Sequence, residues 1–138
     1  MKGRNQRKTV APPSISDAEW KVMNVFWDRG PSTLRDVVES LESGSDWKPR
    51  TVQTLIRRLV TKGALSVEEL GREFRYTPVF SQADCQLDES RSFLGRVFDG
   101  RLVPFLAGMV ESEKIPQEEI EALRRVLDEA ERRQTPSE

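Results

Sequence analysis

Residues 47 to 63 read WKPRTVQTLIRRLVTKG and gather side chains that bind polyanions and read hydrogen-bond patterns. No carboxylate occurs between Asp46 and Glu68, whereas five cations accumulate there: Lys48, Arg50, Arg57, Arg58 and Lys62. A surface of one sign suits a phosphate backbone. Arginine can also pair with guanine, glutamine with adenine, and a threonine methyl with the methyl group of thymine. The stretch therefore has the chemistry of a surface that reads duplex DNA.

The same stretch has the periodicity of a helix. Its apolar residues recur at the i, i+3, i+4, i+7, i+8 spacing of one helix face: Val52, Leu55, Ile56, Leu59 and Val60. Proline is favoured at the first position of a helix and glycine just after the last position, so Pro49 and Gly63 predict the two ends of this helix. The opposite face carries Arg50, Thr51, Gln53, Thr54, Arg57 and Arg58. Such a face is often merely solvated, but solvated faces usually mix both signs of charge, and this one does not.

Two further helices are predicted before this one. Ser16 and Glu19 have the spacing of a capping box, so a helix should begin there and end before Gly30. Thr33 and Asp36 repeat the pattern and predict the start of a second helix, which should end before residues 43–45.

After Gly63 the pattern becomes alternating. Residues 65–70 and 73–78 read as two short strands joined by a turn at Gly71. Three helices followed by a hairpin is the order of a winged helix, in which the third helix enters the major groove and the hairpin lies beside the backbone. We therefore expect DNA contacts from Lys48, Arg50, Thr51, Gln53, Thr54, Arg57, Arg72 and Arg75. The last three of these would contact phosphates.

The second half of the chain differs from the first in charge and pattern. Residues 1–79 hold 14 Lys and Arg against 10 Asp and Glu, whereas residues 80–138 hold 8 against 13. An acidic segment is better suited to protein than to DNA. Its large apolar residues form helical clusters that we expect to mediate dimerisation: Phe93, Leu94, Val97, Phe98, Leu102, Phe105, Leu106, Met109, Ile120, Leu123 and Leu127. The alternative is an ordinary core within one chain, for which the segment is short.

Composition excludes several classes of function. The 138 residues include one cysteine, Cys85, and no histidine, so an intrachain disulfide, the usual zinc sites and histidine-dependent nucleophilic catalysis are unavailable. We expect no enzyme activity, no cofactor and no metal. No stretch is long and apolar enough to span a bilayer, and the basic start lacks the apolar region of a signal peptide, so a cytoplasmic protein is expected.

The expected fold is mainly α with a small β-hairpin: a winged helix-turn-helix domain followed by a helical dimerisation domain. Residues 1–14 are predicted to be a flexible basic arm, 15–79 the winged-helix domain, 80–134 the dimerisation domain and 135–138 a tail.

Three separated motifs also resemble a known family. ISDAEWKVMNVFW, DWKPRTVQTLIRRLVTKGAL and GREFRYTPV occur in the order found in the penicillinase repressor family, which includes the BlaI, MecI and CopY regulators. The resemblance implies a homodimeric repressor that binds a palindromic operator and works with a membrane sensor protease system. It also implies that the helix beginning at Trp47, Pro49, Arg50 and Thr51 enters the major groove.

The departures from the family pattern concern release from DNA. The paired Cys-x-Cys motifs of copper-sensing members are absent, so copper sensing is disfavoured. In the members that control β-lactam resistance an Asn-Phe bond is cleaved. The resemblance places the corresponding bond at Gly108-Met109, where the cleavage specificity is expected to be different or lost. Pro104, Ala107 and Gly108 predict that a helix between Leu102 and Ser112 is interrupted and opens easily. Inactivation of the dimer would then release the operator. The alternative to a repressor is a winged-helix protein-interaction module that never binds DNA.

Overall fold

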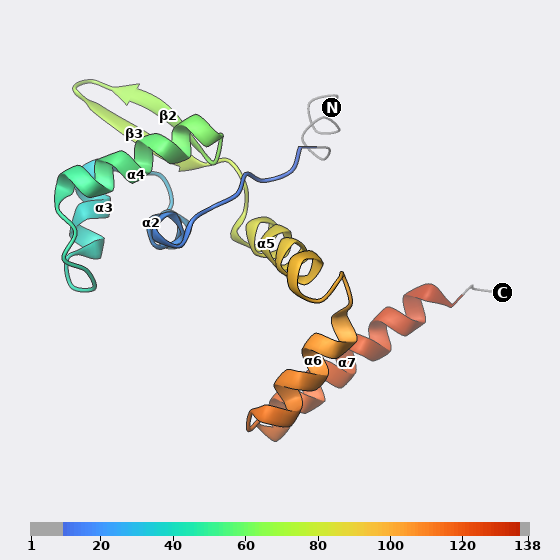
Figure 1. The fold of residues 1–138 in the computed structure, drawn as a ribbon. Coiled ribbons are helices and arrows are strands. Elements are labelled where there is room, and N and C mark those ends of the chain that lie inside the picture. The colour runs from blue at the N-terminus through green and yellow to red at the C-terminus, as the bar shows by residue number, and fades with distance from the viewer. Residues whose placement is uncertain (1–9, 136–138) are drawn as a thin grey trace. The chain divides into compact units, whose positions relative to one another are not determined.

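The computed structural model describes residues 10–135, so residues 1–9 of the predicted arm and 136–138 of the predicted tail lie outside it. The contacts divide the chain into two compact units between Ser92 and Phe93. The elements in chain order are α2 (Asp17–Arg29), β1 (Ser32–Thr33), α3 (Leu34–Leu41), α4 (Pro49–Lys62), β2 (Leu65–Leu70), β3 (Glu73–Pro78), α5 (Gln82–Val97), α6 (Leu102–Ser112) and α7 (Gln117–Gln134). Figure 1 labels all of them except β1.

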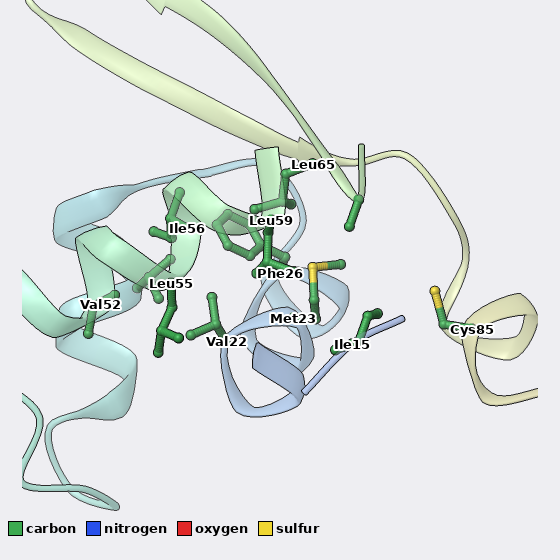
Figure 2. Packing of buried hydrophobic residues seen from close by; sticks show 12 residues of the cluster. Ile15, Val22, Met23, Phe26, Val52, Leu55, Ile56, Leu59, Leu65 and Cys85 are labelled. Carbon is green, nitrogen blue, oxygen red and sulfur yellow. The ribbon is translucent and has the colours of Figure 1, made fainter. Parts of the chain in front are cut away.

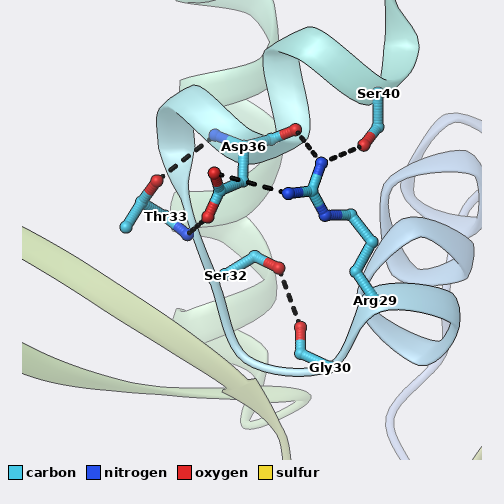
Figure 3. Close-up of polar contacts among 6 residues, drawn as sticks. All are labelled: Arg29, Gly30, Ser32, Thr33, Asp36 and Ser40. Carbon is cyan, nitrogen blue, oxygen red and sulfur yellow. Dashed lines mark hydrogen bonds and ion pairs between the residues drawn. The ribbon is translucent and has the colours of Figure 1, made fainter.

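Local sequence signals set the starts of α2 and α3, as predicted. Ser16 precedes α2, where its hydroxyl accepts from the Glu19 amide and the Glu19 carboxylate accepts from the Ser16 amide. Thr33 and Asp36 form the same reciprocal pair at the start of α3 (Figure 3). These bonds satisfy amides that the first helical turn leaves without partners.

A three-stranded antiparallel sheet follows the helices, with strand order β1-β3-β2. The predicted hairpin is present, with Leu65 opposite Pro78 and Leu70 opposite Glu73. The sheet also includes β1, because Ser32 pairs with Tyr76 and Thr33 with Arg75. Two residues are too few for an alternating pattern, so this strand was not predicted.

The core of the first unit lies between α2, α4 and the base of the sheet. Phe26 is fully buried and lies among Ile56, Leu59 and Leu65 (Figure 2). These residues place the apolar face of α4 inward, as its periodicity predicted. The core therefore holds the opposite face of α4 toward solvent.

The first unit also includes the start of α5. The Cys85 side chain is buried in the same core, and the Trp27 indole nitrogen donates to the Phe80 carbonyl at 3.0 Å. Burial raises the pKa of the Cys85 thiol, and the negative charges of Asp84 and Asp88 raise it further. The core of the first unit thus includes residues on both sides of the predicted domain boundary between residues 79 and 80. That expected domain boundary stays a prediction.

The second unit contains an aromatic cluster and two neighbouring helices. The ring centroids of Phe93, Phe98 and Phe105 lie 5.5 to 5.9 Å apart. Helices α6 and α7 lie side by side (Figure 1) and enclose an apolar groove of about 420 Å³. No residue from Phe93 to Thr135 is buried.

The prediction of an interrupted helix between Leu102 and Ser112 is wrong, because α6 is continuous over that range. Pro104 is its third residue, where the missing amide hydrogen would have had no helical partner. Gly108 lies farther along the same helix, and its carbonyl accepts a hydrogen bond from the Ser112 hydroxyl at 2.7 Å.

Candidate nucleic-acid interface

The outer face of α4 carries the cationic and amide side chains that the sequence predicted. Arg50, Thr51, Gln53 and Arg57 are exposed, and Thr54 is half-buried between them. Arg58, which was not among the predicted contacts, is exposed on the same helix. The helix contains no Asp or Glu, so nothing on it neutralises these charges.

The start of α4 adds a second source of positive potential. Lys48 is the N-cap residue and is exposed, and no side chain caps the helix or places a carboxylate in its first turn. Uncapped amides at a helix start, together with the positive end of the helix dipole, attract phosphates. Beside this end, the Lys21 ammonium lies over the Trp47 ring, 5.5 Å from its centroid. The first turn of α4 therefore adds positive potential to that of the exposed arginines farther along the helix.

The two threonines of the face differ in their hydrogen bonds. Thr54 Oγ1 donates to the Arg50 carbonyl at 3.1 Å. Thr51 makes no side-chain hydrogen bond to any residue within 10–135. The Thr51 hydroxyl is therefore free to bind a ligand, whereas the Thr54 hydroxyl has used its only hydrogen.

Lys62 does not belong to the unpaired cations, contrary to the sequence interpretation. Its Nζ lies 2.6 Å from Glu19 Oε1 and donates to the Ser14 carbonyl at 2.9 Å. The Glu19 side chain is only 2% exposed. Burial alone would raise the pKa of Glu19, but the hydrogen bonds from Lys62 and Ser16 outweigh it and lower that pKa below 4.5. Sequence showed the capping role of Glu19 but not this second partner.

The hairpin is less cationic than expected. Arg72 is exposed at its turn, but the Arg75 guanidinium pairs with the Glu68 carboxylate at 3.2 Å. Glu69 and Glu73 add two more exposed carboxylates. Both predicted arginines thus lie on the hairpin. Of these two, Arg75 has an ion-pair partner and Arg72 has none among the described residues.

A polar network fixes α3 against the end of α2. The Arg29 guanidinium donates to the Asp36 carbonyl at 3.1 Å and to Ser40 Oγ at 2.8 Å, and it pairs with the Asp36 carboxylate at 3.5 Å (Figure 3). The Thr33 amide chiefly lowers the pKa of Asp36, and the charge of Arg29 contributes. This network links the end of α2 to the first two turns of α3.

The described residues provide neither a metal site nor a membrane-spanning helix. Within residues 10–135 no group of three or more Cys, Asp or Glu side chains is arranged to hold a metal ion. No helix in that range has the length and apolar character needed to cross a membrane.

Helices α2, α3 and α4 pack together and are followed by a hairpin, and the exposed face of α4 carries no carboxylate. This arrangement defines a winged helix-turn-helix protein. The chain belongs to the penicillinase repressor family, because residues 15–129 match the sequence model of that family. It is 38% identical over 117 residues to the penicillinase repressor of Bacillus licheniformis, which covers 85% of this chain and 91% of that protein. It is 33% identical over 114 residues to the methicillin resistance regulatory protein MecI of Staphylococcus aureus strain N315, covering 83% and 93%.

Among solved structures, the DNA-binding domain of the repressor BlaI matches with a TM-score of 0.49 and 42% identity. That match covers 53% of this chain and 89% of the BlaI domain. The predicted family is thus confirmed, and the prediction of a transcriptional repressor rather than an enzyme agrees with the name of the Bacillus licheniformis relative.

Proposed function

We propose that the protein is a transcriptional repressor that binds a palindromic operator in duplex DNA as a homodimer. The observation that carries this proposal is the outer face of α4, where exposed Arg50, Gln53 and Arg57 occur without any carboxylate. Membership of a family of repressors supports it. The protein would act in the cytoplasm, where its operator lies.

The exposed residues of α4 divide into two roles. Arg50, Thr51, Gln53 and Thr54 lie in the first half of the helix and have the chemistry that reads base edges in the major groove. Lys48, Arg57 and Arg72 supply charge for phosphates, which orient the protein without reading sequence. Arg75 contributes less, because Glu68 neutralises it.

Dimerisation is supported by the incomplete burial of the second unit. Phe105, Leu106, Met109, Ile120 and Leu123 line the groove between α6 and α7. Val97, Leu102 and Leu127 are at least half exposed, at 56, 50 and 52%. Large apolar side chains left this accessible to water gain burial when a second copy covers them. A dimer also places two copies of α4 on successive major grooves, about 34 Å apart.

Release would then act through the dimer, because loss of the second half-site removes an effective-concentration gain of about 10² to 10⁴ in affinity. A membrane sensor protease system is the expected partner, and Gly108-Met109 is the expected bond. Since α6 is continuous, a protease would have to unwind it locally, and Gly108 lowers the cost of doing so by about 1 kcal/mol relative to alanine. Mass spectrometry during induction of the target genes would reveal the cut, and induction by intact protein would exclude it.

The proposal is tested by selecting duplexes from random-sequence DNA with the intact protein. A repressor should enrich one palindrome whose half-sites are about one helical turn apart, with affinity that falls steeply as salt rises. A winged-helix module for protein interaction would enrich no sequence. Genomic footprinting with the same protein would then identify the regulated genes.

A further inference from the structure

The Thr54 side chain presents a different chemical group to a ligand than Thr51 does. A threonine hydroxyl has one hydrogen to donate, and Thr54 donates it to the Arg50 carbonyl one turn earlier at 3.1 Å. This bond turns the oxygen toward the preceding turn of the helix. The other group on the Thr54 Cβ is a methyl group, which forms no hydrogen bond.

Thr54 also occupies the middle of the outer face. At about 100° per residue, Arg50, Thr54 and Arg57 lie on the side of α4 opposite the buried Val52, Leu55, Ile56 and Leu59. Arg50 and Arg57 thus lie about one helical turn before and after Thr54 on the same face, and both are more exposed than Thr54. Arg50 and Arg57 can contact phosphate or guanine, but a guanidinium group cannot make the apolar contact that a methyl group makes with thymine.

We propose that Thr54 is a specificity-determining residue that recognises thymine through the C5 methyl group, whereas Thr51 uses its free hydroxyl. The assignment rests on the proposed function, since it requires α4 to lie in the major groove. The thymine methyl is exposed in that groove and distinguishes thymine from the other bases. Contact between the two methyl groups removes both from water and needs no hydrogen bond from Thr54.

The experiment uses the intact protein and the palindrome obtained by selection. Each thymine of the half-site is replaced in turn by deoxyuridine, which lacks only the methyl group and keeps the same pairing and the same O4 acceptor. At the position read by Thr54, this replacement should lower the affinity of the unaltered protein about fourfold, the value of one buried methyl-sized group. Replacement of thymines elsewhere should change affinity less.

Two variants of Thr54 separate the methyl from the hydroxyl. Thr54→Val keeps a methyl group and removes the hydroxyl, so its affinity should stay within about twofold and it should still distinguish thymine from deoxyuridine. Thr54→Ser keeps the hydroxyl and removes the methyl, so it should bind the thymine operator about fourfold more weakly and treat the two bases alike. Thr51→Val is the matched control: it should lose affinity and keep the discrimination at the Thr54 position.

Different results would refute the role of the Thr54 methyl group and the proposed binding of an operator. Undiminished discrimination by Thr54→Ser would overturn the role of the methyl, as would loss of operator binding by Thr54→Val or equal binding of thymine and deoxyuridine at every position by the unaltered protein. Failure of the unaltered protein to enrich any sequence would instead refute the proposed function, and the inference with it. Unchanged affinity of each variant for random DNA at low salt shows that it is folded.

Discussion

Lys62 Nζ lies 2.6 Å from Glu19 Oε1 and joins the last residue of α4 to the first turn of α2. The same ammonium donates to the Ser14 carbonyl, so three segments meet at one charge. Since α4 carries the candidate base-reading residues, this pair links the proposed recognition helix to the start of α2. Lys62 therefore acts as a positioning residue, although its place in a run of cations resembles that of a phosphate contact.

Replacement of Lys62 by methionine should destabilise the protein by about 1–3 kcal/mol, because the buried Glu19 carboxylate loses its charged partner. Operator affinity should fall while the salt dependence of binding stays the same, since no phosphate contact is lost. Lys48→Met is the control and should reduce the salt slope by about 1 with little effect on stability. A reduced slope for Lys62→Met would show that Lys62 does contact phosphate. Chemical denaturation and binding titrations at several salt concentrations provide both quantities.

The pair also predicts how stability depends on pH. The pKa of folded Glu19 is lower than 4.5, its ordinary value in an unfolded chain, so its contribution is complete above about pH 4.5 and is lost as the pH falls through the folded pKa. The free energy of unfolding should therefore decrease more steeply with acid in the unaltered protein than in Glu19→Gln, which has no carboxylate to protonate at this position. Denaturation curves between about pH 3 and 7 measure this difference. Parallel pH dependence in both proteins would contradict the assignment.

The structural features that could be predicted from the sequence are those determined by interactions between residues a few positions apart. Ser16 with Glu19, Thr33 with Asp36, and Pro49 with Gly63 set helix ends because their partners lie within one turn or at the boundary itself. The inward face of α4 followed from its period. Pairing of Lys62 with Glu19 could not be foreseen, because 43 positions separate them and only the packed fold brings them together.

One wrong prediction and one contact missed by the sequence have physical reasons of the same kind. Pro104 and Gly108 are poor helix residues on average, and they indicated a break in α6. The position of Pro104 in the first turn removes its cost, and propensity is a weak guide beside tertiary packing. On the hairpin, Arg75 is predicted to contact phosphate, and its pairing with Glu68, seven positions away in sequence, could not be foreseen. Antiparallel pairing places the two residues directly opposite each other.

Arg72 and Arg75 should consequently differ in their effect on DNA binding. Arg72→Ala should weaken operator and random DNA alike and reduce the salt slope by about 1, because it removes an unneutralised charge. Arg75→Ala should change the slope less, since Glu68 already offsets its charge. The double variant Glu68→Gln and Arg75→Ala serves as a control for the charge left on Glu68. Equal slopes for the two single variants would refute this account of the hairpin.

Substitution of Leu123 by glutamate should produce a monomer, because it introduces a charge into the apolar groove between α6 and α7. Gln117→Glu adds the same charge to the exposed first turn of α7, where acidic residues are tolerated, and should leave the dimer intact. Light scattering at micromolar concentration gives the mass of each protein. A monomeric mass for the unaltered protein would contradict the dimer, and a dimeric mass for Leu123→Glu would move the interface away from this groove.

Gln53→Ala tests most directly whether α4 reads bases through its outer face. Gln53 is exposed and carries no charge, so its loss should not alter phosphate binding. The affinities of the unaltered protein and of Gln53→Ala are measured on the selected operator and on random DNA at the same salt concentration. We expect a loss of about 1–3 kcal/mol on the operator and no change on random DNA. Equal losses on the two DNAs, or no loss on either, would mean that this face does not read sequence.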